Sequence, residues 1–87
     1  MLDLTPFLTP FLSLRIARVE EGNFGDMEAV GGGVREMRIF VGKGYRIYYT
    51  VENKKVVLLL TGGIKSNKKQ QQIDIAKAKQ ILSEVEE

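Results

Sequence analysis

Two arginines and one tyrosine are the side chains of this sequence best suited to chemistry. Arg38 and Arg46 fall on two successive stretches with strand-like alternation, and Tyr48 follows Arg46 by two residues. Same-face side chains of neighbouring strands lie close enough to act together. Two guanidinium groups at one groove can hold a phosphodiester and stabilise the charge that develops on it, while a nearby tyrosine can stack on a base or relay a proton.

Lys65 adds a fourth group, because it follows the last strand-like stretch and can serve as a point charge or as an acid or base. RNA brings its own nucleophile in the 2′-hydroxyl group. A site without histidine or metal can therefore still cleave RNA, provided that something orients the RNA backbone. The alternative interpretation is structural: the two arginines are solvated or paired with Glu36 and Glu52, and the tyrosines are half-buried strand aromatics. Spacing alone favours this alternative.

The composition excludes most other kinds of catalytic site. The 87 residues include neither cysteine nor histidine, so disulfides, thiolate metal sites and histidine bases are absent. The stretch 62–66 places Ile64 where a phosphate-binding P-loop needs glycine before its lysine. The carboxylates are scattered, which argues against a two-metal nuclease. We expect neither a metal nor a cofactor.

The length allows one small domain, which we expect to span residues 1–87. The longest apolar run, Val56–Leu60, has the length of a strand and is too short to span a bilayer. Residues 1–12 lack a basic start and include Asp3, unlike a signal peptide. We therefore expect a soluble cytoplasmic protein without membrane contact.

Positive charge is concentrated in the middle of the chain. Residues 1–34 carry two basic and five acidic side chains, residues 35–69 nine basic and two acidic, and residues 70–87 two basic and four acidic. Such a segment favours a polyanionic partner, although it is also typical of a solvated sheet rim with lysines at its edges. The candidate RNA-binding residues of this segment are Arg35, Arg38, Lys43, Lys68 and Lys69.

An N-terminal helix and a loop are predicted before the basic segment. Thr5-Pro6 and Thr9-Pro10 each fit an N-cap residue followed by proline, so the helix can begin at either. Its apolar stripe comprises Leu12, Ile16 and Val19. Residues 22–33 contain five glycines and follow neither a helical nor a strand period, which predicts a loop.

Three strands and a second helix are predicted after this loop. Alternation marks strands over residues 35–41 and 45–51, joined by a tight turn. Residues 56–60 are apolar on both faces, which indicates a central strand covered on both sides. The final helix begins after Ser66 or Asn67. Its apolar stripe comprises Ile75, Ala78, Leu82 and Val85. These elements make an α+β domain, a small antiparallel meander with a helix packed on it.

Five sequence blocks together resemble one protein family. In chain order they are GNFGD (22–26), VGGGVREMRI (30–39), GYRIYY (44–49), LLLTGGIKS (58–66) and DIAKA (74–78). They resemble the HigB-like "addiction module killer" branch of the RelE/ParE toxin superfamily. The resemblance implies a RelE-like fold, in which a short antiparallel sheet carries two N-terminal helices and a C-terminal helix.

The resemblance also implies a function, that of a type II toxin neutralised by a small antitoxin protein. Members similar to RelE enter the ribosome and cut mRNA during translation, using basic and aromatic residues. By this analogy Arg46 is the main transition-state stabiliser. Arg38 and Lys65 would bind backbone phosphate, and Tyr48 would be a stacking group. The implied partners are a cognate antitoxin and mRNA on the ribosome.

Two features depart from the family pattern. Residues 70–78 lack the tyrosine that RelE has on its C-terminal segment, and residues 1–12 differ from the usual first strand and helix. A shortened N-terminus would leave a sheet edge unpaired and favour a homodimer or a toxin–antitoxin hetero-oligomer. Two alternatives therefore stay open: a ParE-like inhibitor of DNA gyrase that cuts nothing, and an inactive truncated toxin that only binds its antitoxin.

Overall fold

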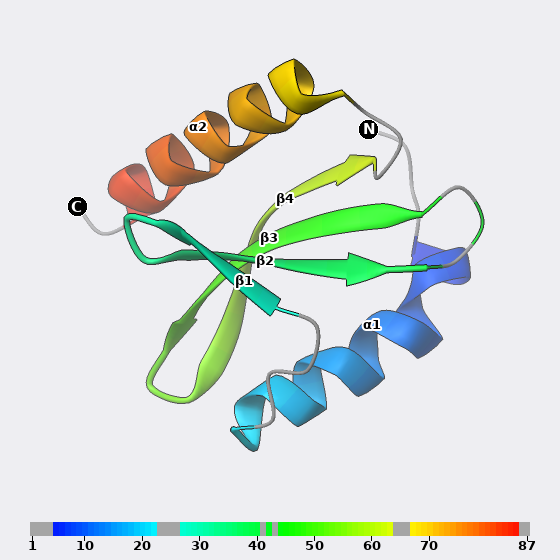
Figure 1. Ribbon diagram of the computed structural model, residues 1–87. Helices are drawn as coiled ribbons and strands as arrows, with labels where there is room; N and C mark the ends of the chain where they lie inside the picture. Colours follow the sequence, from blue (N-terminus) through cyan, green and yellow to red (C-terminus); the bar gives the residue numbers. More distant parts are fainter. Residues whose placement is uncertain (1–4, 23–26, 41, 43, 64–66, 86–87) are drawn as a thin grey trace.

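In the part of the chain that the structure describes, a four-stranded sheet lies between two helices, shown in Figure 1. The computed structural model describes residues 5–22, 27–40, 42, 44–63 and 67–85. The elements are α1 (Thr5–Glu20), β1 (Met27–Gly31), β2 (Val34–Ile39), β3 (Tyr45–Glu52), β4 (Lys55–Gly63) and α2 (Lys68–Val85). The strands form one antiparallel meander in the order β1-β2-β3-β4. The predicted α+β fold is confirmed, and the described residues form four strands where three were predicted.

Two hydrophobic clusters hold the helices, one on each face of the sheet. The cluster under α1 buries Val19, Met37, Ile39, Ile47 and Tyr49. The cluster under α2 buries Val34, Tyr48, Ile75, Ala78 and Leu82. Successive strand residues point to opposite faces. Consecutive residues of β3 therefore enter different clusters, and the sheet forms the middle of three layers (Figure 1).

The segment predicted as a loop, residues 22–33, contains the first strand. β1 pairs antiparallel with β2, and Met27 lies opposite Met37. Gly32 and Gly33 turn the chain between the two strands, both with positive φ as a tight two-residue hairpin requires. The loop prediction is wrong for this part, because a short and mostly exposed edge strand carries no apolar alternation.

β4 lies at an edge of the sheet, whereas its two apolar faces predicted a central strand. Both helices pack on it, which accounts for the pattern. Leu59 and Leu60 belong to the cluster under α2, and Val56 belongs to the cluster under α1. The register of β3 and β4 shifts by one residue at Leu59, so two consecutive leucines reach the same cluster. Leu58 remains 48% exposed at the edge.

Polar side chains fix the helix ends to their surroundings. Asn67 Oδ1 accepts a hydrogen bond from the backbone N–H of Gln70 at 2.8 Å, which makes Asn67 the N-cap of α2 and confirms one of its two predicted starts. The predicted apolar stripe of α2 is buried except for Val85. At the end of α1, the Glu20 carboxylate accepts a hydrogen bond from the backbone N–H of Val56 at 2.8 Å, which ties α1 to β4.

The N-terminal helix begins at the earlier of its two predicted starts. α1 runs from Thr5 and contains both Thr-Pro pairs. Among the described residues this single helix covers its face of the sheet, where the resemblance implied two. Within the same residues, neither helix combines the length and apolar character needed to cross a membrane.

Candidate functional site

Arg38 and Arg46 lie directly opposite each other on β2 and β3. Directly paired residues of antiparallel strands point to the same face of the sheet. This is the face that α2 covers, because Glu36, two residues before Arg38, is hydrogen-bonded to Gln71 of α2. The pairing places two arginines on one face of the sheet, and each guanidinium can bind a phosphate group through two parallel N–H···O bonds.

A row of acidic and phenolic side chains lies beside the two arginines. Glu28 of β1 is paired with Glu36 of β2, which is paired with Tyr48 of β3. Because side chains on one face repeat every two residues, this row is one step along the strands from Arg38 and Arg46. The site therefore combines two cations with two carboxylates.

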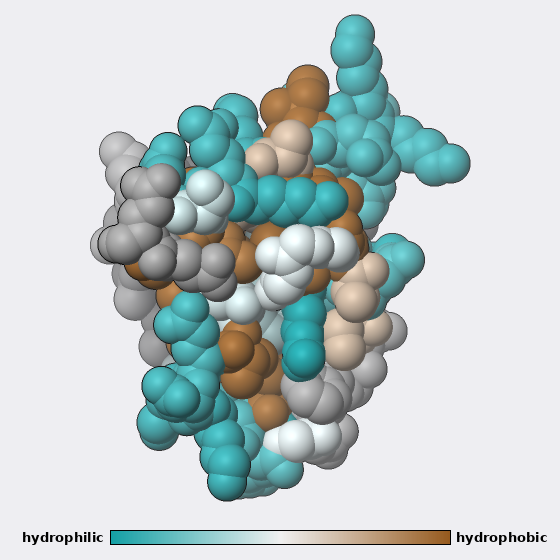
Figure 2. Space-filling view, turned by 90° about the vertical axis from the view of Figure 1, so that its left-hand side faces the viewer, coloured by the Kyte–Doolittle hydropathy of each residue, from teal (hydrophilic) through white to brown (hydrophobic). Residues whose placement is uncertain are grey.

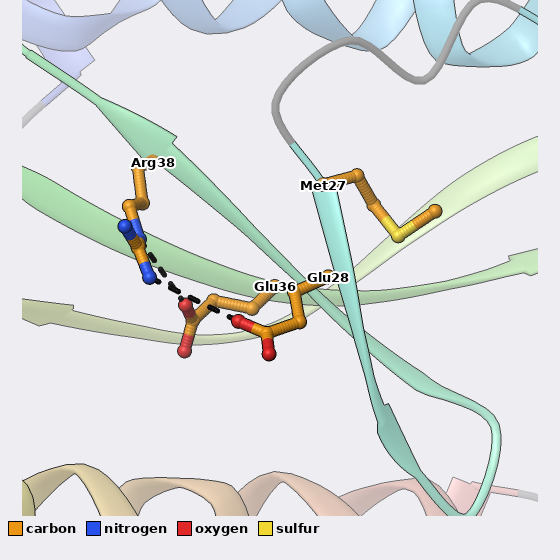
Figure 3. Close-up of a pocket in the computed structure, with 4 residues that line it drawn as sticks. All are labelled: Met27, Glu28, Glu36 and Arg38. Atoms are coloured by element: carbon orange, nitrogen blue, oxygen red, sulfur yellow. Dashed lines mark ion pairs between the residues drawn. The ribbon is translucent and has the colours of Figure 1, made fainter.

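Arg38 is held between the two carboxylates, as Figure 3 shows. Its Nε lies 3.5 Å from Oε1 of Glu36, and its Nη2 lies 3.8 Å from Oε2 of Glu28. The side chains of Arg38 and Glu28 are 45% and 66% exposed, whereas that of Glu36 is 1% exposed. With Met27 they line an open hollow of about 240 Å³. A ligand from solvent can therefore reach the guanidinium from the side of Glu28.

The start of α2 supplies polar partners for this face. Gln71 Nε2 donates to Oε2 of Glu36 at 3.0 Å, and Gln70 Nε2 donates to Oδ1 of Asp74 at 3.0 Å. Asp74 is buried against β4, where a Cβ on Gly62 would lie 2.8 Å from its Oδ2. Glycine at position 62 thus allows the close approach of α2 to the sheet.

Arg46 is half-buried and extends toward the end of β4. Its Nη1 donates to the carbonyl oxygen of Gly63 at 3.4 Å, and its backbone is paired with Gly62. A Cβ added at Gly63 would meet no atom within 4 Å. Gly63 is paired with Tyr45, so its Cβ direction lies on the face of the sheet under α1. Gly62, on the face of Arg46, lies close to Asp74.

Tyr48 is fully buried, which contradicts its predicted role as a stacking group. Its side chain is 0% exposed and packs with Ile75 and Ala78 under α2. Burial raises the pKa of the phenol far above its ordinary value of 10.0, and the charge of Glu36 raises it further, against a smaller opposing effect of Arg46. The phenol therefore stays protonated at neutral pH, and its ring is closed to a base.

The other predicted RNA-binding residues do not form one cluster. Arg35 lies on the opposite face, under α1, where it is paired with Tyr49. Lys68 and Lys69 are exposed in the first turn of α2. Two predicted residues lie outside the described part of the chain, Lys43 and Lys65.

Sequence analysis named neither Glu28 nor Gln71 as part of the site, and it named Glu36 only as an alternative partner of an arginine. The structural alternative paired the arginines with glutamates, and the structure contains one such ion pair, between Arg38 and Glu36. It also places Arg38 directly opposite Arg46. Glu28 was missed because its strand was assigned to a loop. A signal for Gln71 existed, since it lies one turn before Ile75 on the apolar stripe of α2.

The chain matches a family model over most of its length. The model describes "Phage derived protein Gp49-like (DUF891)", and the match covers residues 12–83. The chain belongs to this family. An uncharacterized protein of Haemophilus influenzae is 43% identical to it over 74 residues, which are 85% of this chain and 72% of the relative. No solved structure gives a significant match.

The Gp49-like family is a family of toxins from toxin–antitoxin systems and is related to RelE-type toxins. Membership confirms the prediction that the chain is a toxin of a toxin–antitoxin system, and it implies a cognate antitoxin as partner. The matched segment contains the paired arginines and the carboxylates beside them. The candidate site therefore belongs to the Gp49-like domain itself.

The two buried tyrosines predict that this Gp49-like domain loses stability at alkaline pH. Burial raises the pKa of both Tyr48 and Tyr49 above 10.0. Above pH 10 the unfolded chain therefore releases protons that the native state retains, and the free energy of unfolding falls as pH rises, by up to about 1.4 kcal/mol per pH unit for each tyrosine. Urea unfolding at a series of pH values from about 9 upward measures this slope.

The matched control for this titration is the Tyr48→Phe, Tyr49→Phe double variant. Phenylalanine keeps both rings but has no proton to release, so its free energy of unfolding should depend less steeply on pH. Equal slopes for the variant and the unsubstituted protein would contradict the assignment.

Proposed function

We propose that this Gp49-like toxin is a ribosome-dependent mRNA endonuclease. The observation that supports the proposal is the direct pairing of Arg38 with Arg46 on an accessible face of the sheet. Two guanidinium groups on one face of the sheet can hold an RNA backbone and stabilise charge on a phosphate without a histidine. The exposed lysines at the start of α2, Lys68 and Lys69, add positive potential for RNA.

In the proposed reaction the RNA supplies the nucleophile. The 2′-oxygen attacks the adjacent phosphorus, the bond to the 5′-oxygen breaks, and a 2′,3′-cyclic phosphate and a 5′-hydroxyl group form. The 2′-hydroxyl loses one proton and the 5′-oxygen gains one, and Lys65 is the proposed proton carrier. Arg46 stabilises the charge that builds on the non-bridging oxygens, while Arg38 holds backbone phosphate. Tyr48 takes no part.

Cell-free translation tests this function directly. The purified protein is added to a translation reaction, and the 5′ ends of the mRNA are mapped by primer extension. We expect new ends that disappear when ribosomes are omitted. Intact mRNA with unimpaired translation would contradict the proposal, and a supercoiling assay with DNA gyrase would then separate a gyrase inhibitor from an inactive toxin.

The antitoxin is expected to cover the face that carries Arg38 and Arg46. An antitoxin segment with acidic and apolar side chains would block this face directly, in a toxin–antitoxin hetero-oligomer. Arginine-selective labelling read by mass spectrometry should show both arginines protected in the complex, whereas the exposed Arg18 of α1 stays reactive. A footprint confined to α1 and α2 would contradict this arrangement.

A further inference from the structure

We infer that Glu36 positions Arg38 for RNA, and that Glu28 is an exchangeable partner which an RNA phosphate displaces. The two carboxylates contact the same guanidinium but occupy opposite environments. The inference rests on the proposed RNA cleavage and assigns a separate role to each carboxylate. Neither residue touches the reacting atoms.

Glu36 is the fixed member of the pair. Its side chain is 1% exposed, and its Oε2 accepts a hydrogen bond from Gln71 Nε2 of α2 at 3.0 Å. Its other oxygen, Oε1, lies 3.5 Å from Nε of Arg38. A buried carboxylate is costly unless it is paired, so this charge favours the conformation in which Arg38 stays beside it. The helix thereby fixes the carboxylate, and the carboxylate fixes the arginine.

The contact through Nε leaves the terminal nitrogens of Arg38 for a ligand. A guanidinium has five N–H donors in a planar fork, and its terminal nitrogens can bind phosphate while Nε is held elsewhere. In the free protein Nη2 faces Glu28 at 3.8 Å. The guanidinium is thus oriented before RNA arrives, which lowers the entropy lost on binding.

Glu28 is the exchangeable member. Its side chain is 66% exposed at the rim of the hollow, and its distance to Nη2 is longer than a hydrogen bond. Exposed ion pairs of this kind contribute little, so a phosphate group can take the place of Glu28. Glu28 competes with RNA for Arg38, whereas Glu36 keeps Arg38 in the orientation that RNA needs.

Glu36→Gln and Glu28→Gln form a matched pair that tests this inference. Each removes one negative charge next to the same guanidinium, so a purely electrostatic effect would strengthen RNA binding in both. We expect Glu36→Gln to lower the kcat/KM of ribosome-dependent cleavage by about tenfold or more, because Arg38 loses its orientation. We expect Glu28→Gln to tighten binding of programmed ribosomes carrying non-cleavable 2′-O-methyl mRNA by about threefold.

The same substitutions in an Arg38→Ala background separate positioning from structural damage. If Glu36 acts through Arg38, then Glu36→Gln has no further effect on cleavage once Arg38 is absent. An equal loss in both backgrounds would overturn the inference, as would a gain of cleavage in Glu36→Gln. Gln71→Ala provides a second route should Glu36→Gln fail to fold, and it should lower cleavage by about threefold only when Arg38 is present.

The experiment also distinguishes this inference from the proposed function. If the unsubstituted protein gives no ribosome-dependent cuts, or if Arg38→Ala cuts normally, the role of Arg38 in RNA cleavage fails and the positioning role fails with it. If Arg38→Ala is impaired but Glu36→Gln is not, the proposed function stands and only the inference about Glu36 is overturned.

Discussion

Arg46→Ala is expected to reduce ribosome-dependent mRNA cleavage by about a hundredfold or more while the fold is retained. The guanidinium is the group placed to stabilise the charge that develops on the phosphate. Its Nη1 also donates a hydrogen bond to the carbonyl oxygen of Gly63 at 3.4 Å, so the stability of the variant is measured beside its activity. Primer extension on translated mRNA measures the cuts, and circular dichroism with a thermal melt checks the fold.

Lys55→Ala is the matched control for Arg46→Ala. Lys55 is exposed at the opposite end of β4, where it is paired with Glu52, and its loss removes the same formal charge from the basic segment. If general electrostatic attraction to RNA were decisive, both variants would lose similar activity. A specific role predicts a large loss only for Arg46→Ala, and Arg46→Lys should recover part of it because the charge returns without the planar fork.

The parts of the fold that the sequence predicted are those with a strong period. β2 and β3 alternate clearly, and the turn between them is short, which brings Arg38 opposite Arg46. β1 was missed because an exposed edge strand is specified by its partner and by the turn at Gly32-Gly33 more than by its own composition. β4 was predicted to be a central strand because its residues are apolar on both faces. An edge strand that is covered by a helix on each face has the same pattern.

The sequence predicts the site only to the extent that alternation shows which strand residues lie on the same face of the sheet. Alternation places Tyr48 and Glu36 on the same face as the arginines, and the structure agrees. What alternation cannot show is how far α2 extends over that face. The helix covers Tyr48 through Ile75 and Ala78 and reaches Glu36 through Gln71, so two residues one step from the arginines are buried while Arg38 stays accessible.

Tyr48→Phe and Tyr48→Ala are expected to separate a structural tyrosine from a chemical one. Removing the whole ring leaves a cavity under α2 and should lower the free energy of unfolding by about 3–5 kcal/mol. A small domain has a total stability of about 5–15 kcal/mol, so Tyr48→Ala should populate unfolded protein near physiological temperature. Tyr48→Phe keeps the ring and should change stability by about 1 kcal/mol. Urea unfolding followed by circular dichroism measures both.

Cleavage by Tyr48→Phe then decides the role of the phenol. Because the ring is 0% exposed and burial raises the pKa of the phenol, we expect Tyr48→Phe to cut mRNA within about threefold of the unsubstituted protein. Tyr49→Phe, buried on the other face, is the matched control for loss of a buried hydroxyl group. If Tyr48→Phe alone lost as much cleavage as Arg46→Ala, the phenol would act on RNA directly, and α2 would have to move away from the sheet during the reaction.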